Sequence, residues 1–446
     1  MSWRLVVGRA VRVFIVGILA ACGSNMDGAV GPLASEASLD AIAERYVKIA
    51  LAFREYDESY VDAYFGPASW AADAQARSTP LDELRTEARN LLTVLQATEL
   101  SAEPEIIAAR KDGLEKRLQS MLLRMEMSAG LRLPFDEESR TLFDAVAPAF
   151  DVADVREAIA QLDTIVPGEG TLGDRVNAFR DRFIIPTARL ADVFEAAIGE
   201  CRRRTLAQIQ LPEAESFTLE YVTGQPWSGY NWYRGNSHSL IQINTDLPIY
   251  IDRAVDLGCH EGYPGHHTYN VLVEQNLVDA RGWVEFALMP LYGPMSLISE
   301  GSANYGIELA FPEAERRAFE RDVLFPLANL STAEVDLYYD VLQALERLKY
   351  ADVAIARGYL DGELTAAEAV ARLREQSLLS AERASQRVRF DDAYRSYVIN
   401  YSFGRDLVAE YLESRAGADH NQRWREFELL LSAPISPSLM RTTTVP

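Results

Sequence analysis

The chain has 446 residues, 48% of them hydrophobic, and is therefore long enough to bury a large core. Its 66 acidic residues outnumber its 44 basic residues, which gives a formal net charge of −22. A surface this acidic repels phosphate backbones, so we expect no nucleic-acid partner. The acidity is typical of a solvated surface and is also compatible with the attraction of cationic substrates.

The first 21 residues are typical of a secretion signal. They begin with three arginines and no acidic residue, and the apolar run at 13–21 is too short to span a bilayer. The order Leu-Ala-Ala-Cys at 19–22 resembles the lipobox of bacterial lipoproteins, in which the cysteine is acylated and becomes the first residue after cleavage. We therefore predict a lipoprotein signal peptide over residues 1–21 and lipidation at Cys22. An ordinary secretory peptide is the alternative.

The residue after the lipidation site indicates which membrane would hold the anchor. Gly23 stands where a signal for retention in the inner membrane usually has Asp, so we expect an outer membrane lipoprotein that faces the periplasm. Contact with the membrane would be through the lipid alone, across a flexible tether over residues 22–37 that is rich in Gly, Ala and Ser. Cys201 and Cys259 could pair in an oxidising periplasm or stay as buried free thiols.

Residues 38–446 are predicted to form a single, mainly α-helical domain. Ser38–Phe65 repeats apolar residues at intervals of three and four, which predicts a helix capped by Ser38. The same pattern predicts further N-terminal helices up to residue 205, in the segments 80–100, 103–131, 135–150, 154–166 and 171–209. Their charged faces are typical of solvated helix surfaces.

The segment Phe217–Asn244 differs from the rest of the chain. It is rich in Thr, Tyr, Trp and Ile and is broken by Gly-Gln-Pro and Arg-Gly-Asn, which predicts a few strands with tight connections. Helical periodicity resumes over residues 247–261 and again over 332–413. We therefore expect a large multi-helix body, with a small β-sheet in residues 206–446.

Three of the five histidines lie in the stretch LGCHEGYPGHHTYN, residues 257–270. Histidine is the commonest metal ligand among side chains. In the zinc helix H-E-x-x-H, histidines at i and i+4 differ by about 40° and about 6 Å, so both can bind one ion. Here the residue at i+4 from His260 is Pro264, whereas His266 and His267 lie at i+6 and i+7. Neither would reach the ion from a straight helix.

Pro264 indicates how the spacing is restored. Proline cannot donate the hydrogen bond to the carbonyl of His260 and opens that turn, and Gly265 tolerates the backbone angles of a bulge. If both residues are extruded as a local bulge, His266 takes the place of i+4. Glu261 keeps the position of the glutamate in H-E-x-x-H, which is the general base for the attacking water. We thus predict a kinked zinc-binding helix.

A catalytic zinc site needs a third protein ligand and leaves the fourth position to water. The downstream stretch LISEGSANYGIEL contains E-G-x-A-x-Y, which resembles the third-ligand segment of aminopeptidases of the glutamate-zincin group. We therefore predict Glu300 as the third ligand, at the start of a helical stretch, with Tyr305 near the site. Glu285 and Glu308 are the alternative third ligands, although a structural role is expected for both. Two-histidine, one-glutamate ligation favours zinc over manganese or cobalt.

Two other histidines have two interpretations each. His267 is adjacent to a ligand and faces elsewhere, so it would either support the ligands or contact the substrate. His238, on a predicted strand, would either reach the pocket or have a structural role. Buried imidazoles without metal are the alternative for the whole cluster, but they do not explain the adjacent Glu261 or the matching Glu300 segment.

The motif HEGYPGHH at 260–267 resembles a known family signature. It is similar to the H-E-x-x-P-G-H motif of the bacterial family called domain of unknown function 885, and Tyr46–Pro67 is similar to that family's N-terminal helix. The resemblance covers about residues 39–412. Because the family is grouped with helical zinc peptidases, it implies a mainly α fold and metal-dependent hydrolysis, but no substrate. Ser302 stands where members often have a large aromatic residue, which affects the expected pocket shape more than metal binding.

The attack of water on a carbonyl builds negative charge that a tyrosine or arginine usually helps to stabilise. Arg395, Tyr397, Tyr401 and Arg405 lie close together in the sequence, and Gly404 allows a close approach. The resemblance to the family's late tyrosine segment favours Tyr401 as the donor, with Tyr397 and Arg395 as further catalytic candidates. The alternative is that these aromatic residues only pack helices together.

These residues predict a zinc-dependent hydrolase, a metallopeptidase that cleaves peptide bonds. The edge of the small sheet could pair with an extended peptide substrate. One alternative is an amidase or esterase that uses the same site on a non-peptide substrate. Another is a non-catalytic envelope lipoprotein with structural zinc, although such sites are usually closed by four Cys or His ligands and would leave Glu261 unused.

Overall fold

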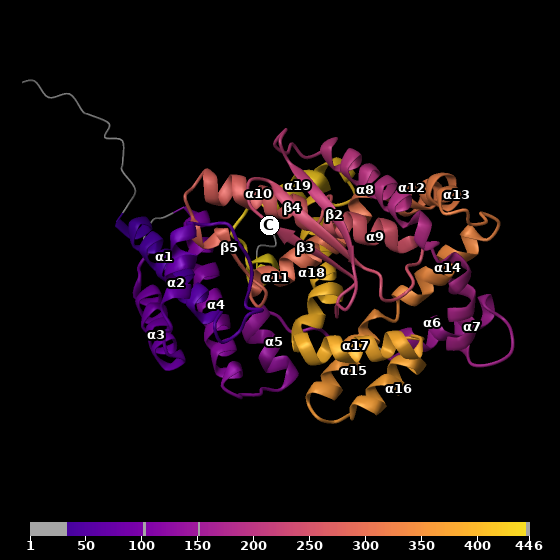
Figure 1. Ribbon diagram of the computed structural model, residues 1–446, viewed down its shortest axis with the longest axis horizontal. Coiled ribbons are helices and arrows are strands. Elements are labelled where there is room, and N and C mark those ends of the chain that lie inside the picture. Colours follow the sequence, from indigo (N-terminus) through magenta and orange to yellow (C-terminus); the bar gives the residue numbers. More distant parts are fainter. Residues whose placement is uncertain (1–33, 101–103, 150–151, 443–446) are drawn as a thin grey trace, which may run out of the picture.

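Helices make up most of the structure, as the spacing of apolar residues predicts (Figure 1). The computed structural model describes residues 34–100, 104–149 and 152–442. The predicted signal peptide, the lipidation site Cys22 and most of the predicted tether lie outside the described residues. A continuous core of buried apolar side chains runs from Leu39 to Met440. The predicted fold class, a large mainly α body with a small sheet, is confirmed.

Four helices in the N-terminal part each begin directly after a proline. Each proline has extended backbone angles, which its fixed φ permits and which suit the residue before a first helical turn. These helices are α2 (Ala68–Ala76), α3 (Leu81–Ala97), α4 (Glu105–Ser128) and α5 (Phe135–Phe143). Apolar residues at intervals of three and four form the buried face of α3: Leu84, Ala88, Leu91 and Leu95.

The predicted helix over Ser38–Phe65 is wrong in its extent. Helix α1 runs from Ala34 to Phe53, and Val61–Tyr64 forms strand β1, which pairs antiparallel with β5 (Leu288–Pro290). Residues 54–59 between α1 and β1 are mostly polar and exposed. This polar run interrupts the apolar periodicity on which a long amphipathic helix depends, so the chain leaves the helix and returns as a strand.

The remaining helices lie before and after the predicted strand segment, residues 217–244, in the sequence. α6 (Val152–Ile165), α7 (Leu172–Arg180) and α8 (Leu190–Leu206) come before the sheet, and α9 (Asp252–Glu261), α10 (His266–Val273) and α11 (Pro294–Ala310) come after it. The C-terminal part contains α12 (Glu313–Phe319), α13 (Phe325–Leu327), α14 (Val335–Glu346), α15 (Lys349–Leu360), α16 (Ala366–Gln376), α17 (Ala381–Tyr394), α18 (Ile399–Ala416), α19 (His420–Leu431) and α20 (Pro437–Thr442). Within the described part of the chain, no helix has both the length and the apolar content of a membrane span.

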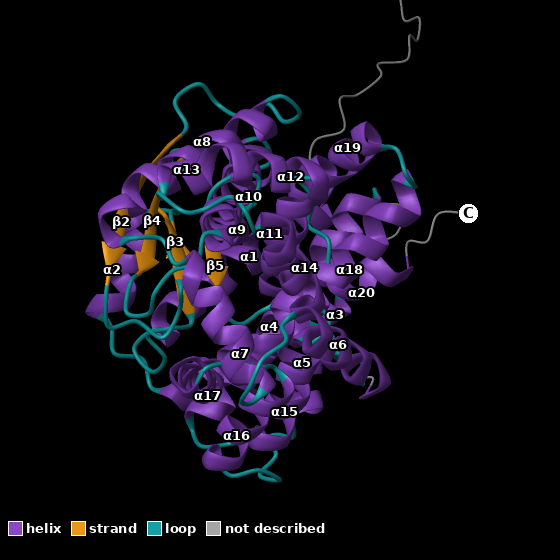
Figure 2. Cartoon of the chain, turned by 90° about the vertical axis from the view of Figure 1, so that its right-hand side faces the viewer, coloured by secondary structure: helices purple, strands orange, loops and turns teal. Residues whose placement is uncertain are grey.

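The strands predicted between residues 217 and 244 are confirmed and form a three-stranded sheet. Its order is β2 (Ser216–Val222), β4 (His238–Asn244), β3 (Gly229–Tyr233), with β2 parallel and β3 antiparallel to the central β4. Alternate residues of β4, Ser239, Ile241 and Ile243, are buried, so one face of the sheet packs against the helices. Figure 2 shows the strands gathered on one side of the helical body. Strand β3, at the sheet edge, packs beside α9 and α10.

The two cysteines left open by the sequence form a disulfide. Cys201 of α8 and Cys259 of α9 are both fully buried, and their Cα atoms are 5.5 Å apart. The bridge ties the residue next to His260 to a neighbouring helix. Such a bond is typical of a protein that is exported to an oxidising compartment.

Removal of this disulfide tests its contribution to stability. The bridge joins residues 58 apart in the sequence, and closing a loop of that length lowers the entropy of the unfolded chain enough to stabilise the fold by about 4 kcal/mol. We expect the double substitution Cys201→Ser and Cys259→Ser to lower the free energy of unfolding by about this amount in urea titrations. The wild-type protein in reductant should give the same curve as the double variant. Unchanged unfolding midpoints would contradict a role in stability.

Candidate metal centre

The helix that carries the histidine motif is interrupted for four residues. α9 ends at Glu261 and α10 begins at His266. The N–H of Gly265 donates to the carbonyl of Cys259 at 3.0 Å, six residues back, where a regular helix spans four. Two additional residues are thus accommodated between His260 and His266. The structure shows a full break where the sequence predicts a bulge in a continuous helix, but the restored spacing is the same.

A glycine is required at position 265 because there is no room for a side chain. The φ of Gly265 is −75°, but its ψ of −137° lies outside both the α and the β regions, so the expectation that glycine supplies unusual angles is confirmed. A Cβ at this position would lie 1.9 Å from the carbonyl oxygen of His260 and 2.5 Å from that of Cys259. Only a residue without a side chain lets the returning backbone approach α9 this closely.

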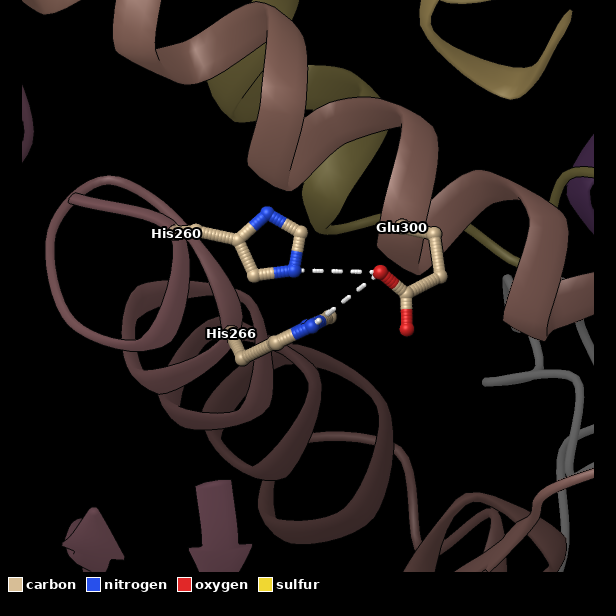
Figure 3. A group of neighbouring side chains, drawn as sticks. All are labelled: His260, His266 and Glu300. Carbon is tan, nitrogen blue, oxygen red and sulfur yellow. Dashed lines mark ion pairs between the residues drawn. The ribbon is translucent and has the colours of Figure 1, made fainter. Parts of the chain in front are cut away.

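The break brings His260, His266 and Glu300 together (Figure 3). The two imidazole rings are nearly perpendicular, with centroids 4.6 Å apart. Oε2 of Glu300 lies 3.1 Å from Nε2 of His260 and 3.6 Å from Nε2 of His266. The three ligand atoms all lie within 4.8 Å of one another. Ligands of a tetrahedral zinc ion lie about 3.4 Å apart, given bonds of about 2.0–2.1 Å, so the three atoms match such a site closely.

The outer ring nitrogen of each histidine has a partner on α11. The amide oxygen of Asn304 accepts from Nδ1 of His260 at 2.9 Å, and the hydroxyl of Ser299 lies 3.0 Å from Nδ1 of His266. Because the amide oxygen can only accept, the proton of His260 is on Nδ1 and its Nε2 lone pair is free to bind a cation. Glu300 lies on the same helix, at its middle and not at its start as predicted.

The two oxygens of the Glu300 carboxylate have different surroundings. Oε1 accepts a hydrogen bond of 2.8 Å from the hydroxyl of Tyr397. Oε2 is buried and has no hydrogen-bond partner among the described residues, although it faces both imidazoles. Burial opposes the ionisation of Glu300, but nearby His266 and His260 outweigh it and hold its pKa well below its usual range. A charged, orphaned carboxylate oxygen between two imidazole lone pairs fits a divalent cation.

Glu261 is buried beside the ligands and lines a cavity that opens over them. Its backbone carbonyl accepts a hydrogen bond of 2.6 Å from the side chain of Asn231 in β3, which fixes the end of α9 against the sheet edge. Burial raises the pKa of the Glu261 carboxyl to about 8 in the metal-free site, against the nearby charge of His266. A poorly solvated carboxylate of this kind is suited to proton transfer.

The structure assigns different positions to the two predicted tyrosines. Tyr397 contacts Glu300 directly and therefore orients a ligand. The hydroxyl of Tyr401 has no hydrogen-bond partner within the described ranges, its ring stacks over His260 at 6.4 Å, and it lines the cavity. Burial, followed by the charges of Glu300 and Glu261, raises its pKa well above its usual range, so the hydroxyl stays protonated and can donate.

A close helix crossing places these tyrosines above the ligands. α11 and α18 meet at Gly301 and Gly404, where a Cβ on Gly301 would lie 2.3 Å from the carbonyl oxygen of Gly404. The absence of side chains lets the two backbones touch, as the sequence predicts for Gly404. This contact sets Tyr401 of α18 opposite Glu300 of α11.

Two predicted residues lie away from the ligands, and a third lines the cavity without contacting a ligand. Arg395 donates to Glu138 at 2.7 Å and so holds the turn before Tyr397, which removes it from the catalytic group. Tyr305 lies near the site as predicted: it lines the cavity and packs its ring on Phe427, while its neighbour Asn304 contacts a ligand. His238 lies 3.1 Å from the hydroxyl of Ser216 at the start of the sheet, which is a structural role.

His267 belongs to a buried network behind the break between α9 and α10. Its Nε2 lies 3.0 Å from Glu215 and its Nδ1 lies 2.8 Å from the hydroxyl of Ser239. Glu215 also accepts from the hydroxyl of Tyr263, within the break, and from Arg202. Burial opposes the ionisation of Glu215, but hydrogen bonds from His267, Tyr263 and Arg202 lower its pKa to about 2. His267 therefore supports the backbone and does not line the cavity.

Sequence reasoning missed three residues of the site. Ser299 and Asn304 flank Glu300 on a helix that is otherwise largely apolar and buried, and this polarity within a buried helix was a usable signal. Asp62 comes from β1, far away in the sequence, and accepts from the hydroxyl of Tyr230 on β3. Burial raises the pKa of Asp62 to about 6. No local pattern connects it to the histidines.

A cavity of about 1460 Å³ opens over the ligands. It is lined by His260, His266, Glu300, Glu261 and Tyr401, and by residues of β3 and α17. This volume exceeds that of typical small-molecule pockets, which measure about 300–1,000 Å³. The cavity therefore has room for a substrate of several residues.

Comparisons with known proteins show the fold but no family. No family model and no curated protein match the chain. A protein from Colwellia psychrerythraea that is named as a candidate lipoprotein is similar in structure, with a TM-score of 0.52 and 14% identity over 93% of this chain and 76% of that chain. This likeness shows a shared fold alone. The similarity to the domain of unknown function 885 therefore stays a prediction from the motif.

Two other solved structures are more distantly similar. One is a candidate lipoprotein of unknown function from Shewanella oneidensis, with a TM-score of 0.44 and 12% identity over 84% of this chain and 75% of that chain. The other is an M32 carboxypeptidase from Deinococcus radiodurans R1, with a TM-score of 0.36 and 13% identity over 92% of this chain and 94% of that chain. At these TM-scores neither likeness supports a conclusion about function.

The substitution Gly265→Ala tests whether the break assembles the metal centre. The added Cβ would overlap the carbonyl of His260, so the backbone must shift and displace His266. We expect zinc affinity to fall by at least about ten- to a hundredfold, as is typical when ligands lose their orientation. Competition with a chromophoric chelator would measure this affinity.

Gly199→Ala is the matched control, because this glycine lies in α8 with open space where a Cβ would be. It should keep the zinc affinity and raise the free energy of unfolding slightly, by about 0.5–1 kcal/mol. Equal zinc affinity in Gly265→Ala and Gly199→Ala would show that the break does not place the ligands.

Proposed function

We propose that the protein is a zinc-dependent hydrolase, most specifically a metallopeptidase. The observation that carries this proposal is the convergence of Nε2 of His260, Nε2 of His266 and an unpartnered oxygen of Glu300, with Glu261 beside them in one cavity. Three protein ligands leave one position open, as in catalytic zinc sites, whereas structural sites are closed by four.

Each residue around the ligands has its own role in the proposed hydrolysis. His260, His266 and Glu300 would hold a zinc ion, which would supply a Lewis acid that polarises a carbonyl and lowers the pKa of water. Glu261 takes the proton of the attacking water and then gives it to the leaving nitrogen, which completes the cleavage of the amide bond. Tyr401 donates a hydrogen bond to the oxygen on which negative charge develops, and Tyr397 keeps Glu300 oriented.

An extended peptide has a place to bind along the sheet edge. β3 is an edge strand, and Gly229, Tyr230 and Asn231 line the cavity beside Glu261. A peptide added to this edge would form main-chain hydrogen bonds and present one bond to the ligands. This arrangement favours a peptide over a compact amide or ester as the substrate.

We propose further that the enzyme is attached by lipid at Cys22 to the outer membrane and faces the periplasm. The basic and apolar N-terminus, followed by Leu-Ala-Ala-Cys, supports this location. The disulfide between Cys201 and Cys259 is in keeping with an oxidising compartment. One structural neighbour is also named as a candidate lipoprotein.

Glu261→Gln separates metal binding from catalysis. Glutamine cannot accept a proton, so we expect peptide hydrolysis to fall by at least about a hundredfold, while the zinc content stays at the wild-type level. Elemental analysis of the purified protein and a peptide-library digest would measure the two quantities. Glu300→Gln is the contrasting variant, and it should lose both zinc and activity. Unchanged hydrolysis in Glu261→Gln would reject the proposed mechanism.

Tyr401→Phe and Tyr397→Phe distinguish an oxyanion donor from a residue that orients a ligand. Loss of a hydrogen-bond donor to the oxyanion costs about 10²–10³ in kcat, and we expect this loss in Tyr401→Phe with normal zinc affinity. Tyr397→Phe should instead weaken zinc binding by about ten- to a hundredfold. Steady-state kinetics at saturating zinc would separate these effects. A larger fall in kcat for Tyr397→Phe than for Tyr401→Phe would reverse the two roles.

A further inference from the structure

Asp62 lies in the cavity without a cationic partner. Its carboxylate accepts a hydrogen bond from the hydroxyl of Tyr230, and it forms no ion pair with any basic residue that the structure describes. It lines the same cavity as Glu261 and Tyr394, so its charge acts within the catalytic cavity. A partly buried carboxylate with a neutral donor alone gains free energy when a cation approaches it.

Two aromatic residues interact with this carboxylate, Tyr230 through its hydroxyl and Tyr394 electrostatically, and each packs against a second ring. Trp227 and Tyr230 are 5.2 Å apart between ring centroids, and Phe390 and Tyr394 are 4.7 Å apart. All four rings line the same cavity as Asp62. Aromatic faces attract ammonium and guanidinium groups, and the attraction is stronger where water is excluded.

Two arginines that line the cavity have acidic partners, whereas Arg117 and Arg383, which also line it, donate to backbone carbonyls. Arg387 on α17 forms an ion pair of 3.4 Å with Asp352, and Arg253 on α9 forms one of 3.1 Å with Asp256. Their charges are therefore balanced within the protein. An anionic substrate group would have to compete with these carboxylates, whereas a cationic group would find Asp62 free.

We propose that Asp62 and this aromatic wall bind a cationic group of the substrate. This inference rests on the proposed peptidase function and names its substrate class, which is peptides with a positive charge near the bond to be cleaved. The cation is either the free α-ammonium of the peptide or a lysine or arginine side chain, since both have the same chemistry. The formal net charge of −22 would attract such peptides to the surface.

Binding to the zinc-loaded, full-length Glu261→Gln variant tests this proposal without turnover. Four probes separate the two sources of charge: trialanine amide with a free N-terminus, its N-acetylated form, and N-acetylated forms with lysine or norleucine in the middle position. Isothermal titration calorimetry would measure the four dissociation constants. We expect at least one cationic probe to bind about ten- to a hundredfold more tightly than its neutral counterpart, as is typical of charge-assisted contacts.

Asp62→Asn, in the same background, should remove this preference and leave the affinity for the neutral probes unchanged. Glu58→Gln is the matched control, because Glu58 is an exposed acid in the same segment outside the cavity, and it should keep the preference. Zinc content and the melting temperature of Asp62→Asn would verify that the site is intact. If folding fails, Tyr230→Phe, which removes the hydroxyl that holds Asp62, should weaken the preference.

Two results would overturn the inference. One is equal binding of cationic and neutral probes by the Glu261→Gln protein. The other is a loss of affinity for all four probes in Asp62→Asn, which would show that Asp62 only maintains the site. A cationic preference that depends on Asp62, combined with no hydrolysis of any peptide by the wild-type protein, would instead uphold this binding site and reject the proposed peptidase.

Discussion

The metal centre depends on one backbone hydrogen bond, from the N–H of Gly265 to the carbonyl of Cys259. It closes a loop of six residues where a helix would close four, and it is sterically open only to glycine. Because of this closure, His266 lies beside His260, where both imidazoles could hold one ion with Glu300. The same turn sends His267 to the opposite side, where it joins the buried network that fixes the break. The two additional residues between His260 and His266 thus place the ligands and also place His267 in the network that supports them.

Helix α11 supplies the third ligand and the groups that orient the two imidazoles. It supplies Glu300 as a ligand, and Ser299 and Asn304 as partners of the two imidazoles, from one and a half turns of helix. Glu300 is buried and Ser299 and Asn304 are half-buried. Burial without partners would be costly, but the side chains of Ser299 and Asn304 and one oxygen of Glu300 are each paired within the site. The close crossing with α18 at Gly404 then brings the tyrosines over the ligands. The ligand Glu300, the residues that orient the imidazoles and the proposed donor Tyr401 therefore all lie on one pair of packed helices, α11 and α18.

The sequence predicts those parts of the site that depend on local spacing. The strands at 217–244, the ligand spacing and the close approach at Gly404 all follow from residues near one another in the chain. Asp62 and the pairing of Arg395 with Glu138 do not, because the partners are far apart in the sequence and only the fold brings them together. The helix predicted over Ser38–Phe65 fails for a different reason, since six mostly polar residues interrupt its apolar face.

The distribution of charge favours a cation at two places in the cavity, one at the three ligands and one at Asp62. The carboxylates of Glu300, Glu261 and Asp62 are among those that line one cavity, while two arginines of its wall, Arg387 and Arg253, are paired with other acids. Burying several negative charges together is unfavourable unless positive charge offsets them. A divalent ion among His260, His266 and Glu300 offsets the charge at the ligands, but Asp62 comes from another element and is not one of them. The charge of Asp62 is therefore left for the substrate to neutralise, which couples the electrostatics of metal binding to the choice of peptide.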